Sequence, residues 1–579
     1  MKRIATQFGC PPPLRRSVVA AAMAGATSLG AHAIEIDTGS PDWTVRWDNS
    51  IAYTLGIRTQ KINDNIGNNP VFAESDYSVK QGGVVTNRLS DLMELDAESK
   101  GGFGARMSAS LFNDFAFRDH VRTNPGDLAP GTPYSSLGAY TNNEFSSYTK
   151  RYYKDGAGLL DAFAFANFKV GDHDASVDVG RLTKYWGNAT FFGTLGINYS
   201  QNAADNIKGA SAPGSQAKEL AIPREQLYLS TQITQDLVVE GQYFLKFKGN
   251  LLPEGGTYLS FADFLTRGPR GAALTSAFGL GQHAPDIAPK NVDSNYGLKL
   301  AWAPSALRGA VSAYYRQLDE TQPWMPLVQY DPQTGEAENY HLAYARHVKL
   351  YGLSLEKQID AYSLGAEISY RRGTALNSSA ANPNDALGTE GARGNVTNVI
   401  VNTVGGLTPT PVWDTGIFLA EVGYSHLNSV TSNAAMFNGT SNAAACPSGS
   451  VANGCSTRNA VLFAGLFKPQ WLGVFPSVDL GLPLFAMYGV KGNTASMGAP
   501  VNEHGVLFTA GIEALVQQKW DITLQYNGYH SKSNGITNGG AAAGVANGTP
   551  GFPTFYAGGN GTFMYNDKGW VSLTVQASF

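Results

Sequence analysis

Nucleophiles and acid–base groups are scattered through this sequence and form no recognisable catalytic pattern. A serine hydrolase needs a histidine within hydrogen-bond reach of its nucleophile. The chain has nine histidines, and their spacing singles out no partner among its many serines and carboxylates. The sequence therefore predicts no catalytic residues, no enzyme activity and no cofactor.

Two small groups of residues could do other chemistry. Glu94, Asp96 and Glu98 alternate along the chain, so they would share one face of a strand, and carboxylate oxygens are ligands for Ca²⁺. The polarity of that face explains them more simply, and we expect no metal site. Cys446 and Cys455 frame the turn-rich segment C-P-S-G-S-V-A-N-G-C. In an exported chain this spacing predicts a disulfide, with two free thiols as the alternative.

The start of the chain carries an export signal. A positively charged region precedes an apolar core at 17–29 and the small-residue cleavage site Ala31-His32-Ala33. We expect residues 1–33 to be a signal peptide and residues 34–579 to form the mature protein. The whole chain has 42 Lys+Arg and 46 Asp+Glu, and loss of the basic leader leaves it more acidic. This balance argues against a nucleic-acid partner, which requires a basic surface.

Alternation with a period of two runs through the mature sequence. At 44–58, apolar side chains fall on one face of an extended strand and polar or charged side chains on the other. The last ten residues, 570–579, repeat this pattern. After the leader, no apolar run approaches the roughly 20 residues of a helical membrane span. In a membrane the chain must therefore form a closed barrel, because only helices and barrels satisfy every backbone polar group in hydrocarbon.

Tight turns alternate with long polar loops between the predicted strands. The strands are expected at 44–58, 88–100, 103–111, 159–170, 174–182, 224–234, 237–248, 291–302, 307–318, 344–357, 361–372, 413–425, 429–438, 459–468, 476–489, 506–516, 519–531 and 563–579. The sequence thus predicts an all-β protein, a transmembrane antiparallel β-barrel of about 18 strands with long extracellular loops. Sixteen strands are the alternative, since 413–438 and 459–489 alternate weakly. A soluble β-sandwich would show similar strands, but the strand number and the export signal favour the membrane barrel.

A barrel of this size encloses an aqueous channel unless something fills it. The segment 183–223, after the fifth predicted strand, lacks alternation and is rich in apolar residues. We expect it to fold inward as a constriction or plug loop, the alternative being a loop packed over the rim. The candidate constriction residues are Arg181, Lys184, Trp186, Phe191 and Phe192.

A second apolar segment lies at 255–268. Ser260 followed by Asp263 is typical of a helix start, so a short helix would gather apolar side chains on one face. On the extracellular side this face could collect an apolar ligand; the alternative is that it packs against its own barrel. The candidate residues of the ligand patch are Tyr258, Phe261, Phe264 and Leu265.

Two motifs carry a resemblance to a known family, G-R-L-T-K-Y-W-G at 180–187 and G-T-Y-L-S at 256–260. The chain resembles, from its first strand to its end, a family of large proteobacterial outer-membrane β-barrel proteins catalogued as a domain of unknown function. Members often carry Gln after the Gly-Arg pair, where Leu182 stands here. The resemblance implies association with RND-type exporters and periplasmic carriers, and traffic in lipids. More distantly, the chain is similar to long-chain fatty acid channels and substrate-specific porins.

These observations predict a channel in the outer membrane of a Gram-negative bacterium. Its cargo would be small hydrophobic or amphipathic molecules such as lipids, fatty acids, sterols or aromatic compounds, passed by a loop-gated pore. The alternatives are a porin for small polar solutes such as carboxylates and, in another class, a surface structural or adhesion barrel. Expected partners are outer-membrane lipid, the barrel assembly machinery, a periplasmic lipid carrier and an RND-type exporter. The terminal Phe579 resembles the assembly signal of bacterial outer-membrane barrels.

Overall fold

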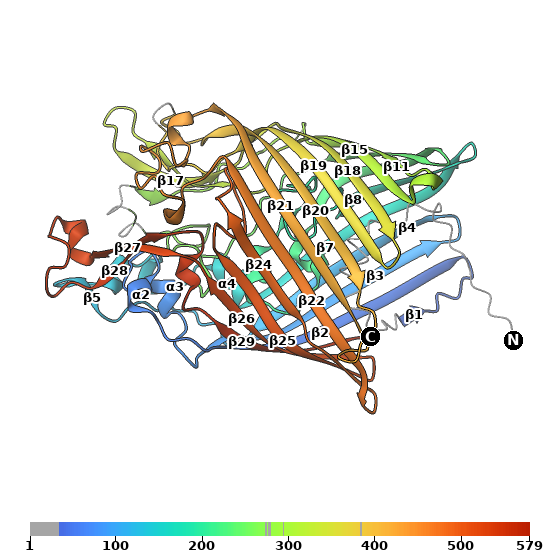
Figure 1. Ribbon diagram of the computed structural model, residues 1–579, viewed down its shortest axis with the longest axis horizontal. Helices are drawn as coiled ribbons and strands as arrows, with labels where there is room; N and C mark the ends of the chain where they lie inside the picture. Colours follow the sequence, from blue (N-terminus) through green and yellow to red (C-terminus); the bar gives the residue numbers. More distant parts are fainter. Residues whose placement is uncertain (1–33, 272–274, 276–279, 293, 383–384) are drawn as a thin grey trace.

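A computed structural model describes residues 34–271, 275, 280–292, 294–382 and 385–579. The predicted signal peptide lies outside these residues. Most of the chain forms one antiparallel sheet whose first and last long strands, β2 and β29, pair with each other. Because Thr54 of β2 lies opposite Thr574 of β29 in this pairing, the sheet closes into a barrel (Figure 1).

Eighteen strands make the barrel wall, counting β23 and β24 as one strand interrupted at Leu482 and Pro483. Each strand pairs with the next along the chain. They are β2 (Trp43–Arg58), β3 (Val84–Ser99), β4 (Phe103–Asp114), β7 (Asp155–Val170), β8 (His173–Leu182), β11 (Arg224–Thr234), β12 (Leu237–Phe244), β14 (Tyr296–Trp302), β15 (Gly309–Leu318), β18 (Val348–Ile359), β19 (Tyr362–Ala375), β20 (Arg393–Gly406), β21 (Thr415–Ser432), β22 (Asn459–Phe475), β23 (Val478–Gly481) with β24 (Leu484–Lys491), β25 (Val506–Val516), β26 (Trp520–His530) and β29 (Trp570–Ser578). The short β1 (Ile34–Ile36) pairs with β2.

The remaining elements lie in the connections. The helices are α2 (Asp64–Gly67), α3 (Ala73–Tyr77), α4 (Ser147–Tyr153), α5 (Asn206–Ser211) and α6 (Ala217–Leu220), with single 3₁₀ turns at Tyr134–Leu137, Thr141–Asn143, Ser305–Leu307, Ala434–Met436, Val451–Asn453, Gly539–Ala543 and Phe563–Tyr565. The short strands are β5 (Asp127–Ala129), β6 (Thr132–Pro133), β9 (Ala203–Ala204), β10 (Ala221–Ile222), β13 (Gln282–His283), β16 (Trp324–Tyr330), β17 (Ala337–Ala343), β27 (Ser533–Asn538) and β28 (Thr554–Gly559). Within the described ranges, no helix has the length and hydropathy of a membrane span.

The two ends of the barrel differ in the length of their connections. The turn after β7 is only 171–172, whereas the loop after β12 covers 245–295. Figure 1 shows β1 and the carboxyl terminus toward one end, and β17, β27, β28, α2 and α3 at the other. The chain therefore begins and ends its sheet at the short-turn end, and the long loops gather at the opposite end.

The outer face of the wall is apolar. Side chains such as Leu353 and Ile512 are more than half exposed, at 55% and 58%, and they alternate with buried inward residues. Exposed aromatic side chains mark both ends of this apolar band. At the short-turn end they are Trp43, Phe103, Phe168, Trp302, Tyr362 and Trp520, and at the long-loop end Phe115, Tyr243, Tyr296, Tyr351 and Tyr488. Two aromatic girdles around an apolar band are typical of a bilayer-spanning barrel.

The predicted fold class and the count of eighteen strands are confirmed, but two strand assignments are wrong. The expected hairpin at 413–438, with its turn at 426–428, is the single strand β21, and β20 falls in a segment expected to be a loop. The two errors cancel in the count. Alternation fails in β20 because its inward residues include Val396 and Ile400, which are 0% and 1% exposed. Apolar residues on both faces remove the period-two signal.

Candidate functional site

The segment 183–223, here called the lumen loop, leaves β8 and crosses the inside of the barrel. On one side, Arg316 of β15 donates to the carbonyl of Ile197 at 2.7 Å. On the other side, the carbonyl of Pro213 accepts the hydroxyl of Thr54 in β2 at 3.1 Å. Because β15 and β2 lie on opposite sides of the eighteen-strand ring, the lumen loop spans the lumen.

Glu421 of β21 holds the middle of the lumen loop. Its carboxylate accepts the backbone N–H groups of Thr190 at 2.6 Å, Phe191 at 2.9 Å and Phe192 at 2.6 Å. Three consecutive N–H groups outside regular secondary structure need acceptors when they are buried. A wall carboxylate, 1% exposed, supplies them with charge-assisted hydrogen bonds, which are stronger than neutral ones.

Glu367 of β19 holds the preceding turn. Its two oxygens accept the N–H groups of Asn188 at 2.5 Å and Ile197 at 2.8 Å. Gly187, from the G-R…W-G motif, lies against this carboxylate with φ of +82°, and a Cβ atom there would stand 2.5 Å from Glu367 Oε2. The motif glycine is therefore required both by its backbone conformation and by its close approach to the wall.

Apolar side chains of the lumen loop form a core inside the barrel. Phe192 and Leu195 pack with the inward residues Ile400 of β20 and Leu462 of β22. Trp186 is 1% exposed, and its indole N–H donates to Glu240 of β12 at 2.8 Å. The inner wall is thus partly apolar where the lumen loop covers it, and polar where it binds the loop backbone.

The structure distributes the predicted constriction residues over several places. Trp186 and Phe192 are buried in the loop's own core. The Phe191 ring lies 5.3 Å from that of Phe485, centroid to centroid. Lys184 forms an ion pair with Asp178 at 2.5 Å, so it lies along the inner wall. These side chains do not form a single ring around an opening.

The placement of Arg181 at a constriction is wrong. β8 continues to Leu182, which is 1% exposed and faces inward. Arg181 shares the other face of the strand with Val179, which is 48% exposed on the outside of the barrel. The expected strand 174–182 already contained Arg181, and its alternation puts this residue on the same face as Val179. The prediction failed because it grouped Arg181 with the loop that follows the strand.

The predicted ligand-patch helix at 255–268 is also absent. Asp263 does not start a helix of its own; it accepts the N–H groups of Glu74 at 2.7 Å and Ser75 at 3.0 Å, in the first turn of α3. Tyr258 is 7% exposed and its hydroxyl donates to the carbonyl of Lys568 at 2.9 Å. The segment therefore packs against other loops and has no free helical face.

The remaining patch residues take part in the same packing. Phe261 lies 6.3 Å from the ring of Tyr565, and Phe264 lies 6.1 Å from that of Tyr340, centroid to centroid. Leu265 is partly buried against the same cluster. Loops 59–83, 245–295 and 531–569 thus share one apolar core above the barrel, here called the loop cap.

A buried charged network ties the loop cap to the wall. Arg58, at the end of β2, is 0% exposed and pairs with Asp76 at 2.9 Å and Asp567 at 3.2 Å. The same guanidinium donates to the carbonyl of Val79 at 2.8 Å. Loops distant in sequence therefore meet at one wall residue.

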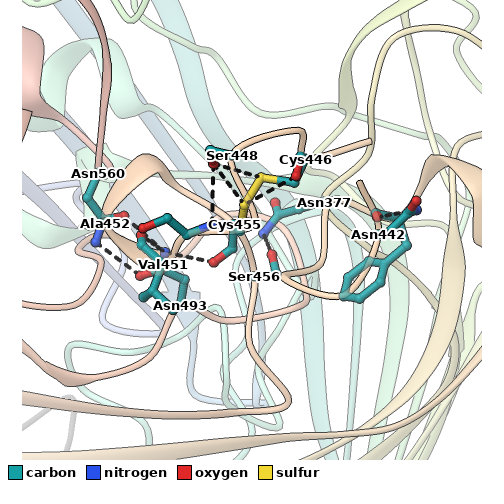
Figure 2. The surroundings of a disulfide bond; sticks show 12 residues. Asn377, Asn442, Cys446, Ser448, Val451, Ala452, Cys455, Ser456, Asn493 and Asn560 are labelled. Atoms are coloured by element: carbon teal, nitrogen blue, oxygen red, sulfur yellow. Dashed lines mark hydrogen bonds between the residues drawn. A yellow bond between two sulfur atoms is a disulfide. The ribbon is translucent and has the colours of Figure 1, made fainter. Parts of the chain in front are cut away.

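The disulfide joins Cys446 and Cys455, with 5.9 Å between their Cα atoms, in the loop between β21 and β22. Figure 2 shows Asn493 beside it, donating to the carbonyls of Val451 and Cys455 at 3.0 Å each and to Asn560 at 3.0 Å. The cross-linked loop is thereby attached to the two long loops that follow it.

The described histidines and carboxylates show no catalytic or metal-binding arrangement. Among the described residues, no histidine bonds a serine or cysteine side chain, and no cluster of three or more His, Cys, Asp or Glu is arranged to hold a metal ion. Glu94 is paired with Arg106 and Lys218, and Arg106 also contacts Asp96 at 3.4 Å. The acidic face considered for Ca²⁺ is therefore neutralised by cations.

Sequence reasoning missed the groups that hold the lumen loop. Glu367 was visible only as one polar residue of an alternating strand, and Glu421 fell in a strand with weak alternation. A lone carboxylate in mid-strand, on an inward face of small or apolar residues, is the signal that marks both. Such a group must find donors from another segment.

Comparison with known proteins gives one family and several distant structures. The crystal structure of Acinetobacter baumannii OccAB4 is similar at 9% identity, over 93% of this chain and 98% of that chain, with a TM-score of 0.39. Pseudomonas aeruginosa OpdK with vanillate is similar at 7% identity, over 92% of this chain and 98% of that chain, with a TM-score of 0.40. A BenF-like porin from Pseudomonas fluorescens Pf-5 is similar at 9% identity, over 93% of this chain and 98% of that chain, with a TM-score of 0.38. No curated protein matches the chain. The model of the family described as protein of unknown function, DUF1302, matches residues 14–579, and the chain belongs to this family.

Proposed function

We propose that this protein is an outer-membrane channel for small hydrophobic or amphipathic molecules, gated by the lumen loop and without a catalytic step. The observation that carries the proposal is the attachment of a non-strand segment to both sides of the lumen, at Arg316 and at Thr54. An eighteen-stranded barrel is too wide for wall side chains alone to fill. The short strands of this segment, β9 and β10, pair only with each other, so the segment can move without breaking the hydrogen-bond ladder of the wall.

The outer surface supports a place in the membrane. The apolar band and its two aromatic girdles match a bilayer and its interfaces. In bacterial barrels the short turns face the periplasm, so the long loops and the loop cap would face the outside.

The inner wall under the lumen loop favours apolar cargo. Val396, Ile400 and Leu462 point inward and are at most 1% exposed. Movement of the lumen loop would uncover them and give the lumen a partly apolar lining. Hydrated ions gain nothing from such a surface, whereas an apolar chain or ring is stabilised on it.

Polar solutes are the second candidate, because charged groups also line the lumen. Lys299 pairs with Glu240 at 3.0 Å and Lys468 with Glu513 at 2.5 Å. These charges compensate one another and favour neither anions nor cations along the wall.

The family resemblance adds a proposed partnership with a periplasmic lipid carrier and an RND-type exporter, which would meet the short-turn end.

The test is transport by the purified protein in proteoliposomes. Labelled octanoate, benzoate and a sterol are offered beside arabinose and acetate, and entry is timed against liposomes without protein. Faster entry of the amphipathic or apolar compounds supports the proposal. Faster entry of the polar compounds alone shows a solute porin, and no entry of any compound, together with loss of cell adhesion on shortening the long loops, shows a surface structural barrel.

A further inference from the structure

A cavity of about 730 Å³ lies where the wall, the lumen loop and the loop cap meet. Thr86 and Arg88 of β3 line it from the wall, Ser211 of α5 lines it from the lumen loop, and 256–259 lines it from the cap. Its volume lies within the range of pockets that bind small molecules. The cavity thus joins the three parts of the protein that a passing ligand would meet.

Arg88 faces this cavity without a partner of its own. It is only 5% exposed, and its guanidinium carbon lies 3.6 Å from the centroid of the Phe112 ring. Within the described residues, the guanidinium of Arg88 makes no ion pair within 4.0 Å and no hydrogen bond, whereas that of Arg58 makes both. Asp114, Glu219 and Asp205 act on its charge from beyond ion-pair distance, but no described group accepts from its guanidinium. A buried donor without an acceptor is costly, so a carboxylate in the cavity would form hydrogen bonds that Arg88 now lacks.

Asp114, an acidic group in the cavity lining, is already engaged. One oxygen accepts the hydroxyl of Thr86 at 2.5 Å. The other accepts the N–H groups of Asn87 at 3.0 Å and Ala116 at 2.9 Å. This carboxylate is oriented by the wall and by the chain that leaves β4, and the hydrogen-bonding capacity of the Arg88 guanidinium remains available.

The rest of the lining combines further cations with apolar surface. Lys80, Arg118 and Arg122 are exposed at the cavity and form no ion pair in the described part of the chain. Clustered charges of one sign attract ligands of the opposite sign. The apolar and aromatic residues of the lining include Val85, Phe117, Phe145, Tyr153, Tyr258 and Leu259.

We propose that this cavity binds a carboxylate attached to an apolar body, with Arg88 holding the carboxylate and the aromatic lining holding the body. The inference rests on the proposed channel function and names its cargo as amphipathic monocarboxylates. A guanidinium presents two parallel donors that match the two oxygens of a carboxylate. Because the carboxylates of Asp114, Glu219 and Asp205 already act on Arg88, they would repel a second negative charge on the ligand, which favours a monoanion over a phosphate dianion.

The experiment measures equilibrium binding to the purified full-length barrel by dialysis. The probes are octanoate, benzoate, the neutral analogue octanamide and inorganic phosphate. Octanoate is expected to bind at least tenfold more tightly than octanamide, and benzoate shows whether an aromatic body serves as well as an aliphatic one. Equal affinities for octanoate and octanamide, or tighter binding of phosphate, would overturn the assignment.

Variants locate the binding site. R88Q should weaken octanoate at least tenfold and leave octanamide within twofold, and R88K should restore part of the affinity. R224Q is the matched control, because Arg224 is also a buried wall arginine stacked on a phenylalanine, 4.0 Å from the Phe244 ring, but lies outside this cavity and donates to the carbonyl of Ser200 at 3.3 Å. Unchanged octanoate binding in R88Q would refute the role of Arg88.

The experiments test the proposed binding site and the proposed channel function independently. If octanoate binds through Arg88 but no compound enters proteoliposomes, the binding site in the cavity is supported and the channel function is refuted. Octanoate could instead enter the liposomes at the same rate through the native protein and R88Q, and bind both equally. This result would support the channel function and show that the cavity is not its cargo site. Should R88Q not fold, the comparison of octanoate, octanamide and phosphate on the native protein decides.

Discussion

Glu421 and Phe192 are 229 residues apart in sequence, yet the carboxylate of one accepts the backbone N–H of the other at 2.6 Å in the middle of the barrel. The Phe192 ring is fully buried at this point, packed against the inner wall. A wall acidic group and a loop aromatic residue thus fix the lumen loop across the pore. The consequences of this attachment can be measured.

The first prediction concerns release of the lumen loop. E421Q replaces a carboxylate acceptor of three N–H groups by a neutral amide, and each lost charge-assisted hydrogen bond is worth roughly 1.5–3 kcal/mol. We expect larger and more frequent conductance steps in planar bilayers than for the native protein. E513Q is the control, because Glu513 is an inward carboxylate paired with Lys468, away from the lumen loop. Identical conductance of E421Q, E513Q and native protein would show that the loop does not gate the pore.

The second prediction concerns the anchor of the loop cap. R58M takes from the buried Asp76 and Asp567 the cation that pairs with both, and leaves Lys568 as the buried cation near them. Breaking comparable buried pairs costs about 3–5 kcal/mol. We expect proteases to cleave loops 59–83 and 531–569 faster, while the barrel keeps its heat-modifiable migration on gels.

The control for this anchor is R372M, which removes an exposed arginine from β19. It should leave the cleavage rate of both loops unchanged. If R58M is as resistant as the native protein, the charged network does not hold the cap, and the apolar core described above carries that role alone.

The third prediction concerns the disulfide. Closing a short loop restricts the unfolded chain and stabilises the folded loop by about 2–3 kcal/mol. C446S/C455S should therefore increase hydrogen exchange around Asn493, which bonds the carbonyl of Cys455. Treatment of the native protein with a reductant should reproduce the change, whereas the double variant should not respond to the reductant. Equal exchange in all samples would count against a stabilising role.

The fourth prediction concerns pH. Burial raises the pKa of Glu254 in the loop cap to about 7, although its carboxylate accepts the hydroxyl of Thr266 at 2.8 Å and the N–H of Gly268 at 2.6 Å. The folded cap therefore binds a proton more tightly than the opened cap does. Its stability is full below the ordinary glutamate pKa near 4.5 and is lost progressively as pH rises to about 7.

We expect the opening free energy of 254–268 to be larger at pH 5 than at pH 8, by up to about 3 kcal/mol. Hydrogen exchange corrected for intrinsic rates measures it. E254Q should reduce this difference, and burial also raises the pKa values of Glu74 and Asp263, which would supply the remainder. E144Q, a change at an exposed loop carboxylate, is the control. A pH-independent opening energy in the native protein would refute the prediction.

The closed antiparallel barrel could be predicted because its signal is local. In β26 and β29, each side chain's face depends only on its position in the alternation, and the polarity of two neighbouring residues reveals it. Tight turns such as 171–172 separate strands, and long loops follow in strict order. The strand class followed from such short-range patterns, and the predicted export signal was read from them too.

The sequence by itself also marked the lumen loop as a segment too apolar for an open loop. It did not determine which wall residues hold it, since Glu421 and Thr190 are 231 positions apart. The strand β20 was hidden because its inward residue Ile400 packs on the lumen loop.

Only the tertiary structure decided these points, for one physical reason. The lumen of this barrel is filled by its own chain, so inward residues respond to a distant segment rather than to water. Where the lumen loop covers Ile400, an inward position is apolar, and where it presents backbone N–H groups, an inward position such as Glu367 is acidic. The outward face of a strand is apolar because it meets the bilayer, and the alternation of the sequence shows this. The residues of the inward face depend on contacts with a segment distant in sequence, which no local pattern shows.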